Sequence, residues 1–373
     1  MTHFDVVVVG AGIVGLGAAL AAHDRGLRVA VVDRATGVNG SSIRNFGHVG
    51  VTGQSGEALG YALASREIYL SLAERAGLWV SQRGAAIVAR GDDELALLAA
   101  FAEERGSDQV VLAGVVEMRE RTPVRDPAVT GGAFLPLDLQ VDPRAAAPTI
   151  AAWLEAQGVA FFWGRSVLGI ETGVVHTAAG ELRAETVVVA VNFDVDQFYP
   201  EIAAGAGLRR CGLDMLSVDW NGRRPLDTPL LTGSSMLRYS GFASVPSAAS
   251  MRERLRRESP ELLQLDINQM YTERPDGTLV IGDTHHRGTA VPPFQSERDF
   301  AVLERITAEL FDRPIRLRQR WQGVYASAPQ DFLIESPAAG VHVVAVTTGI
   351  GMTTGLGLGE TVINGIFGSG REQ

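Results

Sequence analysis

The stretch Phe4–Gly15, FDVVVVGAGIVG, decides the fold of the N-terminal part of the chain. Its first six residues form an apolar, valine-rich run, which is typical of a strand buried on both faces of a parallel sheet. GAGIVG follows at once and places its glycines in the spacing GxGxxG. The helix-compatible segment Leu16–Arg25, a turn at Gly26 and a second apolar run over residues 27–32 complete a predicted β-α-β unit.

Asp33 ends the second predicted strand, near the position where a carboxylate accepts hydrogen bonds from the ribose hydroxyls of a dinucleotide. Glycines in this spacing can also serve a tight turn alone. The order of strand, glycines, helix, strand and acid instead predicts dinucleotide binding. The residues expected to contact the dinucleotide here are Gly10, Gly12, Ile13, Val14, Gly15, Asp33 and Arg34.

The composition is that of a globular protein with one large domain or two ordinary ones: 373 residues, 46% of them hydrophobic. The net charge of -10 argues against a general nucleic-acid or anionic-membrane binder. The sequence contains no lysine, so every permanent side-chain cation is an arginine. A single cysteine, Cys211, no signal-peptide pattern and no membrane-spanning apolar run fit a cytoplasmic protein.

A second glycine-rich stretch, GSSIRNFGHVGVTGQ, covers residues 40–54. It resembles the second fingerprint of the D-amino-acid oxidase and glycine/sarcosine oxidase superfamily. In that family the segment follows the pyrophosphate of FAD toward the flavin ring, where small residues, hydroxyls and backbone N–H groups approach anionic oxygens. The resemblance implies cofactor contacts from Ser41, Ser42, Arg44, Asn45, Phe46, Gly47 and His48.

The resemblance continues through most of the chain. Residues 147–167 are similar to the family's helix, glycine and strand element, and residues 174–192 to its hairpin and following strand. Asn192 and Phe193 stand where members commonly have a small residue and glycine. A strand over residues 341–346 precedes TTGIGMTTGLGLGETV, which we interpret as a cofactor turn rather than a helix packed through its glycines. The further FAD contacts implied are Val167, Val191, Asn192, Gly349, Gly351, Met352, Thr353 and Thr354.

These placements predict an α/β fold, α+β overall, with a discontinuous Rossmann-like FAD-binding domain and a mainly antiparallel β-sheet substrate domain. The expected ranges are 1–80, 139–196 and 324–373 for the first domain, and 81–138 and 197–323 for the second. Residues 95–104 and 251–265 are expected to form exposed helices with solvated charges. FAD should be held noncovalently, because the family's attachment cysteine lies near the C-terminus and Cys211 does not.

Several segments, among them SIRNFGHVGVTGQ, SSMLRYSGF and GDTHHRG, resemble a subgroup of flavin-dependent oxidoreductases encoded among phosphonate-catabolism genes. The resemblance implies oxidation of a small amine with an anionic group, 2-aminoethylphosphonate or its N-methyl derivative, to phosphonoacetaldehyde and the released amine. A glycine/sarcosine-type amino-acid oxidase or dehydrogenase is an alternative activity. The sequence also leaves open an NAD-dependent dehydrogenase and a non-catalytic flavin-binding subunit of a hetero-oligomer.

An anionic headgroup needs a fork of donors, which in this chain must come from arginine. The candidates are Arg44, Arg238, Arg287 and Arg320, each of which could instead form an ordinary ion pair. Arg238 and Tyr239 are expected on a sheet strand facing the flavin. Substrate contacts are predicted from Arg44, Arg238, His286, Trp321 and Tyr325, and catalytic roles from His48, Tyr239 and His285.

The adjacent pair His285 and His286 lacks the spacing of metal ligands on one helical face, and no carboxylate cluster completes it in the sequence. We therefore expect no metal. We expect molecular oxygen as the electron acceptor. Another acceptor is the alternative, because the lysine that promotes the reaction with oxygen in several sarcosine-oxidase relatives has no counterpart here.

Overall fold

The computed structural model describes residues 3–220 and 224–368. The predicted β-α-β unit is present as β1 (His3–Val9), α1 (Ile13–Asp24) and β2 (Val29–Val32). β1 and β2 pair in parallel, with Val6 opposite Val29. The helix begins at Ile13, directly after the glycine-rich turn, and so earlier than the sequence pattern suggests.

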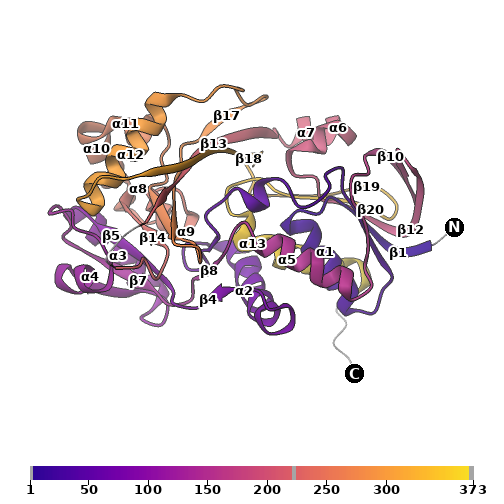
Figure 1. Cartoon of the computed structure of the whole chain (residues 1–373), viewed down its shortest axis with the longest axis horizontal. Helices are drawn as coiled ribbons and strands as arrows, with labels where there is room; N and C mark the ends of the chain where they lie inside the picture. Colours follow the sequence, from indigo (N-terminus) through magenta and orange to yellow (C-terminus); the bar gives the residue numbers. More distant parts are fainter. Residues whose placement is uncertain (1–2, 221–223, 369–373) are drawn as a thin grey trace.

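The first sheet has eight strands and carries this unit at its centre (Figure 1). Its parallel core has the order β20-β12-β1-β2-β9. An antiparallel hairpin and β19 extend it at the edges. The further strands are β9 (Ala160–Phe162), β10 (Val167–Glu171), β11 (Val174–Thr177), β12 (Gly180–Val189), β19 (Phe332–Ala338) and β20 (Val341–Val346).

Helices cover one face of this sheet: α1, α2 (Gly56–Ala76), α5 (Ala146–Ala156) and α13 (Gly351–Phe367). Alternate residues of β1 supply the two faces, because successive side chains of a strand point in opposite directions. Val6 and Val8 belong to the helix-side core, whereas Val7 and Val9 belong to the core on the other face. The two buried faces explain why Val6–Val9 are all apolar.

The second sheet has nine strands and pairs antiparallel except between β5 and β14. Its long strands β13 and β18, of which β18 is an edge strand that pairs only with β13 among the described residues, lie above the first domain in Figure 1. The strands are β5 (Ala85–Ala89), β6 (Val111–Gly114), β7 (Gly131–Leu135), β13 (Arg209–Asp219), β14 (Leu230–Leu231), β15 (Met270–Glu273), β16 (Thr278–Gly282), β17 (His286–Gly288) and β18 (Leu317–Ser327). A small third sheet contains β3 (His48–Val49), β4 (Val80–Ser81) and β8 (Leu139–Val141).

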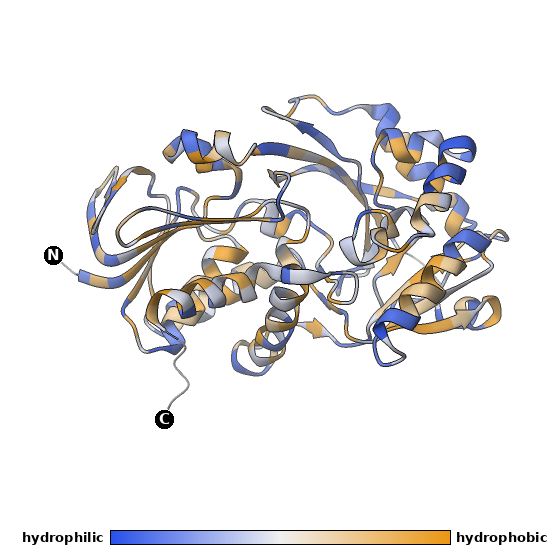
Figure 2. Cartoon of the chain, turned by 180° about the vertical axis from the view of Figure 1, so that it is seen from behind, coloured by the Kyte–Doolittle hydropathy of each residue, from blue (hydrophilic) through white to orange (hydrophobic). Residues whose placement is uncertain are grey.

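Helices of the second domain surround this sheet, and α10 to α12 are largely hydrophilic at its outer edge (Figure 2). The longer ones are α3 (Asp92–Arg105), α10 (Ala248–Glu258) and α12 (Glu297–Phe311). Shorter ones are α4 (Val115–Arg121), α8 (Gly233–Met236), α9 (Ser240–Ala243) and α11 (Pro260–Gln264). α6 (Val195–Phe198) and α7 (Pro200–Gly205) instead pack against the first sheet, in the same core as Val7 and Val9, and 3-10 turns lie at Ser41–Ile43 and Asn192–Asp194. Asp92, Glu103 and Glu104 of α3 are exposed as expected, but Glu94 is buried in an ion pair with Arg254, and Leu97, Leu98 and Phe101 are fully buried.

The fold class predicted from the sequence is confirmed, since the first sheet draws its strands from separate parts of the chain around the segments that build the second. The residue boundaries of the two domains stay a prediction. β18 spans the expected boundary at 324 and pairs with β13 along the second sheet.

One local expectation was wrong. Arg238 and Tyr239 do not lie on a strand but between the short helices α8 and α9. The side chains of Thr232 and Ser235 donate to the carbonyl of Gln269, at 3.1 Å each, and hold this segment against β15 as a helical turn.

The glycines of the C-terminal stretch also serve packing. A Cβ on Gly357 would lie 2.3 Å from the carbonyl oxygen of Tyr61 in α2, and one on Gly359 would lie 2.4 Å from the backbone nitrogen of Ala18 in α1. The stretch is therefore a turn at Gly349 followed by a helix that approaches two neighbours closely, so it combines the two interpretations that the sequence presented as alternatives.

Candidate cofactor and substrate site

A cavity of about 640 Å³ is lined by residues of both large sheets and their loops. Gly10, Asp33 and Val167 line it from the first domain, and Asn268 and Tyr325 from the second. Its size is within the usual range for ligand pockets, which is roughly 300–1,000 Å³.

The first glycine-rich turn forms one wall of the cavity. Gly10 has φ 103°, and a Cβ there would lie 2.5 Å from the carbonyl oxygen of Ala190. Gly15 lies outside the lining; its missing side chain lets α1 approach Gly10, whose carbonyl oxygen would be 2.0 Å from a Cβ. Asp33 accepts hydrogen bonds from the N–H groups of Ala11 and Ala35, at 2.8 Å each.

The second glycine-rich segment is tied to the first by Ser42, whose Oγ accepts a hydrogen bond from the N–H of Ile13 at 2.9 Å. Ser41 donates to the carbonyl of Val324 at 2.6 Å. Asn192 donates to Ser41 Oγ at 2.5 Å and accepts from the N–H of Ala326 at 2.7 Å. These bonds join the loop after β2 to the end of β12 and to β18.

Asn192 resolves the departure from the family pattern. Its φ of 58° lies in the left-handed region, which asparagine adopts more readily than most residues other than glycine. It therefore supplies the turn that glycine would supply, and its amide adds the two bonds to Ser41 and Ala326.

The remaining predicted residues of this loop line the cavity, but several are already engaged. Asn45 holds the loop through the carbonyl of Ser41 and the N–H of Gly47, at 2.9 and 2.7 Å. Arg44 donates to Asn39 at 2.9 Å. His48 is buried with its Nε2 2.9 Å from Asp138, a partner that sequence reasoning did not identify.

The second domain contributes a contiguous group of polar and apolar side chains to the lining, which we call the second-sheet lining: Arg238, Tyr239, Asn268, Met270, Asp283, His285 and Tyr325. Arg238 is 14% exposed and forms an ion pair with Asp266. Burial raises the pKa of Asp283 to about 7. Burial, reinforced by the positive charge of Arg238, holds the pKa of His285 well below 6.5, and burial raises that of Tyr325 well above 10.

Other predicted site residues lie outside the cavity lining. His286 is paired with Asp214 at 3.1 Å, and the ring of Trp321 lies under the guanidinium of Arg144. Arg287 and Arg320 form ion pairs with Asp266 and with Glu297 and Glu304. Thr354 donates to the carbonyl of Ile350 within α13. These placements do not support direct ligand contacts for His286, Trp321, Arg287, Arg320, Thr354 and Gly15.

Sequence reasoning missed Asn268, Met270 and Asp283. Asp283 stands in the quoted segment GDTHHRG, directly after β16, where a buried carboxylate was a recognisable signal. The premise that no carboxylates join the histidine pair was also wrong. Asp214 and Asp299 meet His286, with one ligand atom of each residue within 4.8 Å of the others. These groups pair with one another, and the absence of a metal stays a prediction.

A family model described as DAO, FAD dependent oxidoreductase, matches residues 5–364. The chain belongs to the DAO family. It is therefore an FAD-dependent oxidoreductase, and FAD is its cofactor. A comparison with curated protein sequences gives no match.

Solved structures of the same fold include glycine oxidase from Geobacillus kaustophilus, with TM-score 0.77 and 20% identity over 98% of this chain and 94% of that one. L-proline dehydrogenase from P. horikoshii has TM-score 0.78 and 18% identity over 97% and 93% of the two chains. Dithionite-reduced L-alpha-glycerophosphate oxidase from Mycoplasma pneumoniae, with FAD bound, has TM-score 0.74 and 14% identity over 97% and 95%. At these identities the likeness establishes the fold.

The residues of the DAO-family chain fit FAD. The close approach at Gly10, the start of α1 and the Ser41–Ser42 turn leave room and donors for phosphates, and Asp33 keeps acceptor capacity beside its two backbone bonds. Among helices in the described ranges, 3–220 and 224–368, none is long and apolar enough to cross a bilayer.

Replacement of Asp33 by alanine is expected to weaken FAD binding by about 1.5–3 kcal/mol, the usual value of a hydrogen bond to a charged group. Titration of the flavin-free protein with FAD measures the loss. Asp24→Ala, which removes a half-exposed ion pair with Arg75, is the control and should leave FAD affinity unchanged. Equal FAD affinity in the two variants would contradict the role of Asp33.

Proposed function

We propose that the protein oxidises a small amine that carries an anionic group, with 2-aminoethylphosphonate or its N-methyl derivative as the leading candidate substrates. The products would be phosphonoacetaldehyde and ammonia or methylamine. The observation that carries the proposal is Arg238, a cation only 14% exposed, in a cavity that is also lined by Asp283, Tyr239 and Tyr325. Such a lining offers a partner to each charge of an amine with an anionic group.

Arg238 would hold the anionic group of the substrate. Its ion pair with Asp266 is shared, because Asp266 is also held by Arg287 at 2.7 Å. The N–H groups of Arg238 can therefore bind a ligand while Asp266 stays paired with Arg287. Tyr239 and Tyr325 stay protonated at neutral pH, since burial raises the pKa of both hydroxyls, and a protonated hydroxyl donates to phosphonate or carboxylate oxygens.

When bound, FAD supplies the oxidant that accepts a hydride from the carbon beside the amine nitrogen. The chain's own residues bind and orient the amine, exclude water and remove its proton. We propose that the cofactor is held noncovalently by the predicted contacts that line the cavity. Cys211 is fully buried in β13 and outside the lining, and burial raises the pKa of its thiol.

The alternative substrate is a simple amino acid such as glycine or sarcosine. Solved structures with this fold include a glycine oxidase and an L-alpha-glycerophosphate oxidase, so the architecture accommodates enzymes named for carboxylate and for phosphate substrates. Arginine binds both kinds of anion through paired donors. We favour the phosphonate on the sequence resemblance and oxygen as the electron acceptor.

The test is anaerobic reduction of the protein-bound flavin by 2-aminoethylphosphonate, its N-methyl derivative, glycine and sarcosine. We expect the phosphonates to bleach the flavin absorbance with kcat/KM at least about tenfold above glycine and sarcosine, because a phosphonate dianion offers Arg238 one more charge. Faster reduction by glycine or sarcosine would establish the amino-acid alternative. Oxygen uptake in the same preparation distinguishes an oxidase from a dehydrogenase.

A further inference from the structure

The second-sheet lining contains two buried acceptor atoms that no protein donor satisfies. Asp283 is 4% exposed and Asn268 is 6% exposed, and both line the cavity. Asp283 Oδ1 and Asn268 Oδ1 have no hydrogen-bond partner among the described residues, although the Asn268 side chain also lies within hydrogen-bonding reach of the Asp283 carboxyl and lowers its pKa. Because a buried acceptor without a donor costs about 1–3 kcal/mol, two such atoms at one cavity wall indicate a ligand that brings donors.

His285 adds a third acceptor. Its Nδ1 lies 2.8 Å from the carbonyl oxygen of Asp266, which can only accept, so Nδ1 carries the ring proton. The ring is neutral at pH 7, since burial and Arg238 hold its pKa well below 6.5. Its Nε2 therefore bears a lone pair, and this atom lies 3.7 Å from Asp283 Oδ2.

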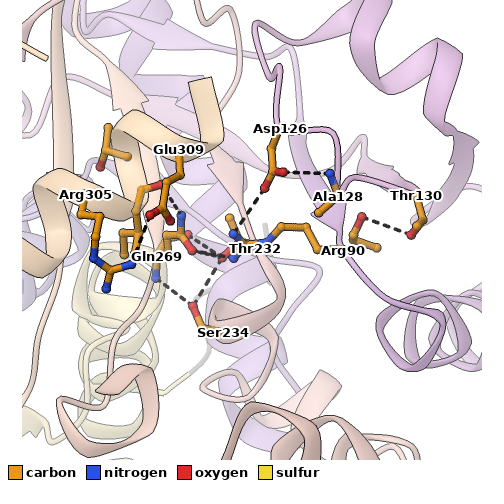
Figure 3. A network of polar contacts seen from close by, with 12 residues as sticks. Arg90, Asp126, Ala128, Thr130, Thr232, Ser234, Gln269, Arg305 and Glu309 are labelled. Atoms are coloured by element: carbon orange, nitrogen blue, oxygen red, sulfur yellow. Dashed lines mark hydrogen bonds and ion pairs between the residues drawn. The ribbon is translucent and has the colours of Figure 1, made fainter. Parts of the chain in front are cut away.

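The fold holds these residues in place from the opposite side of the strand. Gln269, between Asn268 and Met270, donates to Tyr271 at 2.9 Å and accepts from Arg90 at 2.8 Å within the polar network of Figure 3. Asn268 and Asp283 bond each other through both backbone groups, at 2.8 and 2.9 Å. The acceptor side chains are thus fixed before a ligand enters, which lowers the entropic cost of binding.

We infer that Asp283, Asn268 and His285 form a cradle for the ammonium group of the substrate, and that this cradle selects primary amines over their N-methyl counterparts. The inference deepens the proposed function and rests on it. A primary ammonium carries three N–H donors for three acceptors, whereas an N-methylammonium carries two and brings a methyl group against an acceptor. The arrangement excludes phosphonate or carboxylate from the same position, because acceptors and a carboxylate would repel an anion.

The same groups would prepare the amine for oxidation. The ammonium R–CH2–NH3+ gives one proton to the carboxylate of Asp283, directly or through His285 Nε2, which leaves R–CH2–NH2. Loss of a hydride from the α-carbon to FAD then gives the iminium R–CH=NH2+. Water adds to this ion and releases R–CHO and NH4+, so that the hydride taken by the cofactor and the proton taken by Asp283, in total two electrons and two protons, remain with the enzyme.

The first test compares kcat/KM for flavin reduction within two matched pairs: 2-aminoethylphosphonate with its N-methyl derivative, and glycine with sarcosine. In wild type the primary amine of the faster pair should lead by roughly 10-fold or more, the value of one hydrogen bond to a charged group. Asp283→Asn should lower kcat/KM for the primary amine by roughly 10- to 100-fold and shrink that lead. Asn268→Leu, which removes an uncharged acceptor, should shrink the lead with a smaller loss of rate.

Asp214→Asn is the matched control. Asp214 is also a buried carboxylate, but it is paired with His286, the residue after His285, and lies outside the cavity lining. It should lower stability while leaving the ratio between primary and N-methyl amine unchanged. A preference for the N-methyl amine in both pairs, or an unchanged ratio in both cradle variants, overturns the inference while leaving the proposed function intact.

Two further readouts separate the cradle from the proposed function. Binding of 2-aminoisobutyrate or 2-amino-2-methylpropylphosphonate, whose amine carbon carries no hydrogen, is measured by the change in flavin absorbance. Binding should weaken at least about tenfold in Asp283→Asn, even if none of the four amines reduces the flavin. Reduction by none of them contradicts the proposed function, and unaltered analogue binding in the variant contradicts the cradle.

The pH profile gives the second of these readouts. Burial raises the pKa of Asp283 to about 7, against the lowering effects of Arg238 and the Asn268 side chain and with the charge of Asp266 acting in the same direction as burial. His285, Tyr239 and Tyr325 line the same cavity. Below that pH the carboxyl is protonated and accepts no ammonium proton, so kcat/KM should rise with pH through about 7 in wild type. This rise of kcat/KM with pH should be absent in Asp283→Asn and present in Asp214→Asn.

Discussion

Arg238→Ala is expected to lower kcat/KM for the best amine at least roughly 100-fold. The corresponding loss of about 3–5 kcal/mol is the cost of removing one partner from a buried charge pair. The anionic group of the substrate would then meet the carboxyl of Asp283 in a cavity wall that has lost its buried cation, while Asp266, outside the lining, has lost one of its two ion pairs. Most of the effect should appear in KM, since the guanidinium holds a group remote from the reacting carbon. Steady-state kinetics with saturating FAD measure it.

Two further expected results would tie the lower kcat/KM to binding of the anion. Asp266 keeps its ion pair with Arg287, so the variant should fold and retain FAD. Added guanidinium should partly restore the rate, because the deleted group leaves a site of its own shape. Arg44→Ala is the matched control: Arg44 also lines the cavity but donates to Asn39. If Arg44→Ala raises KM and Arg238→Ala does not, the two arginines exchange roles.

The sequence predicted the β-α-β unit beside the cavity because the signals for it are local. The strand, the glycine turn, α1 and Asp33 follow one another within the first thirty-odd residues, and each forms where its own residues favour it. Even the unusual Asn192 was visible as a departure. Its role depends on Ser41, in the loop after β2, and on Ala326 of β18, which come from distant parts of the chain.

The substrate side was predicted less completely because it is assembled from loops that meet only in the folded chain. Arg238, Asn268 and Asp283 come from three segments of the chain. Arg238 lies in a helical turn and not on the predicted strand, because the side chains of Thr232 and Ser235 donate to the carbonyl of Gln269. The pair His285 and His286 carried a usable signal. Adjacent residues at a strand end point to opposite sides, so at most one of them could be expected in the cavity.

Gly15→Ala is expected to destabilise the flavin-free protein by about 3 kcal/mol or more, at the upper end of the cost of overpacking. The added Cβ would stand 2.0 Å from the carbonyl oxygen of Gly10 and 3.2 Å from Val8 Cγ1. The first contact is with backbone, so α1 must move away from β1, and the turn that would hold the FAD phosphates moves with it. FAD affinity should therefore fall together with stability.

Gly60→Ala is the matched control, the same change in an exposed helical position of α2 where a Cβ meets nothing within 4 Å. It should raise stability by about 0.5–1 kcal/mol, because alanine loses less backbone freedom than glycine in a helix. Urea unfolding of both variants without FAD measures the two effects free of the cofactor's own contribution. A Gly15→Ala protein as stable as wild type would mean that α1 tolerates displacement, and that Gly15 is not required for the close contact between the helix and the turn.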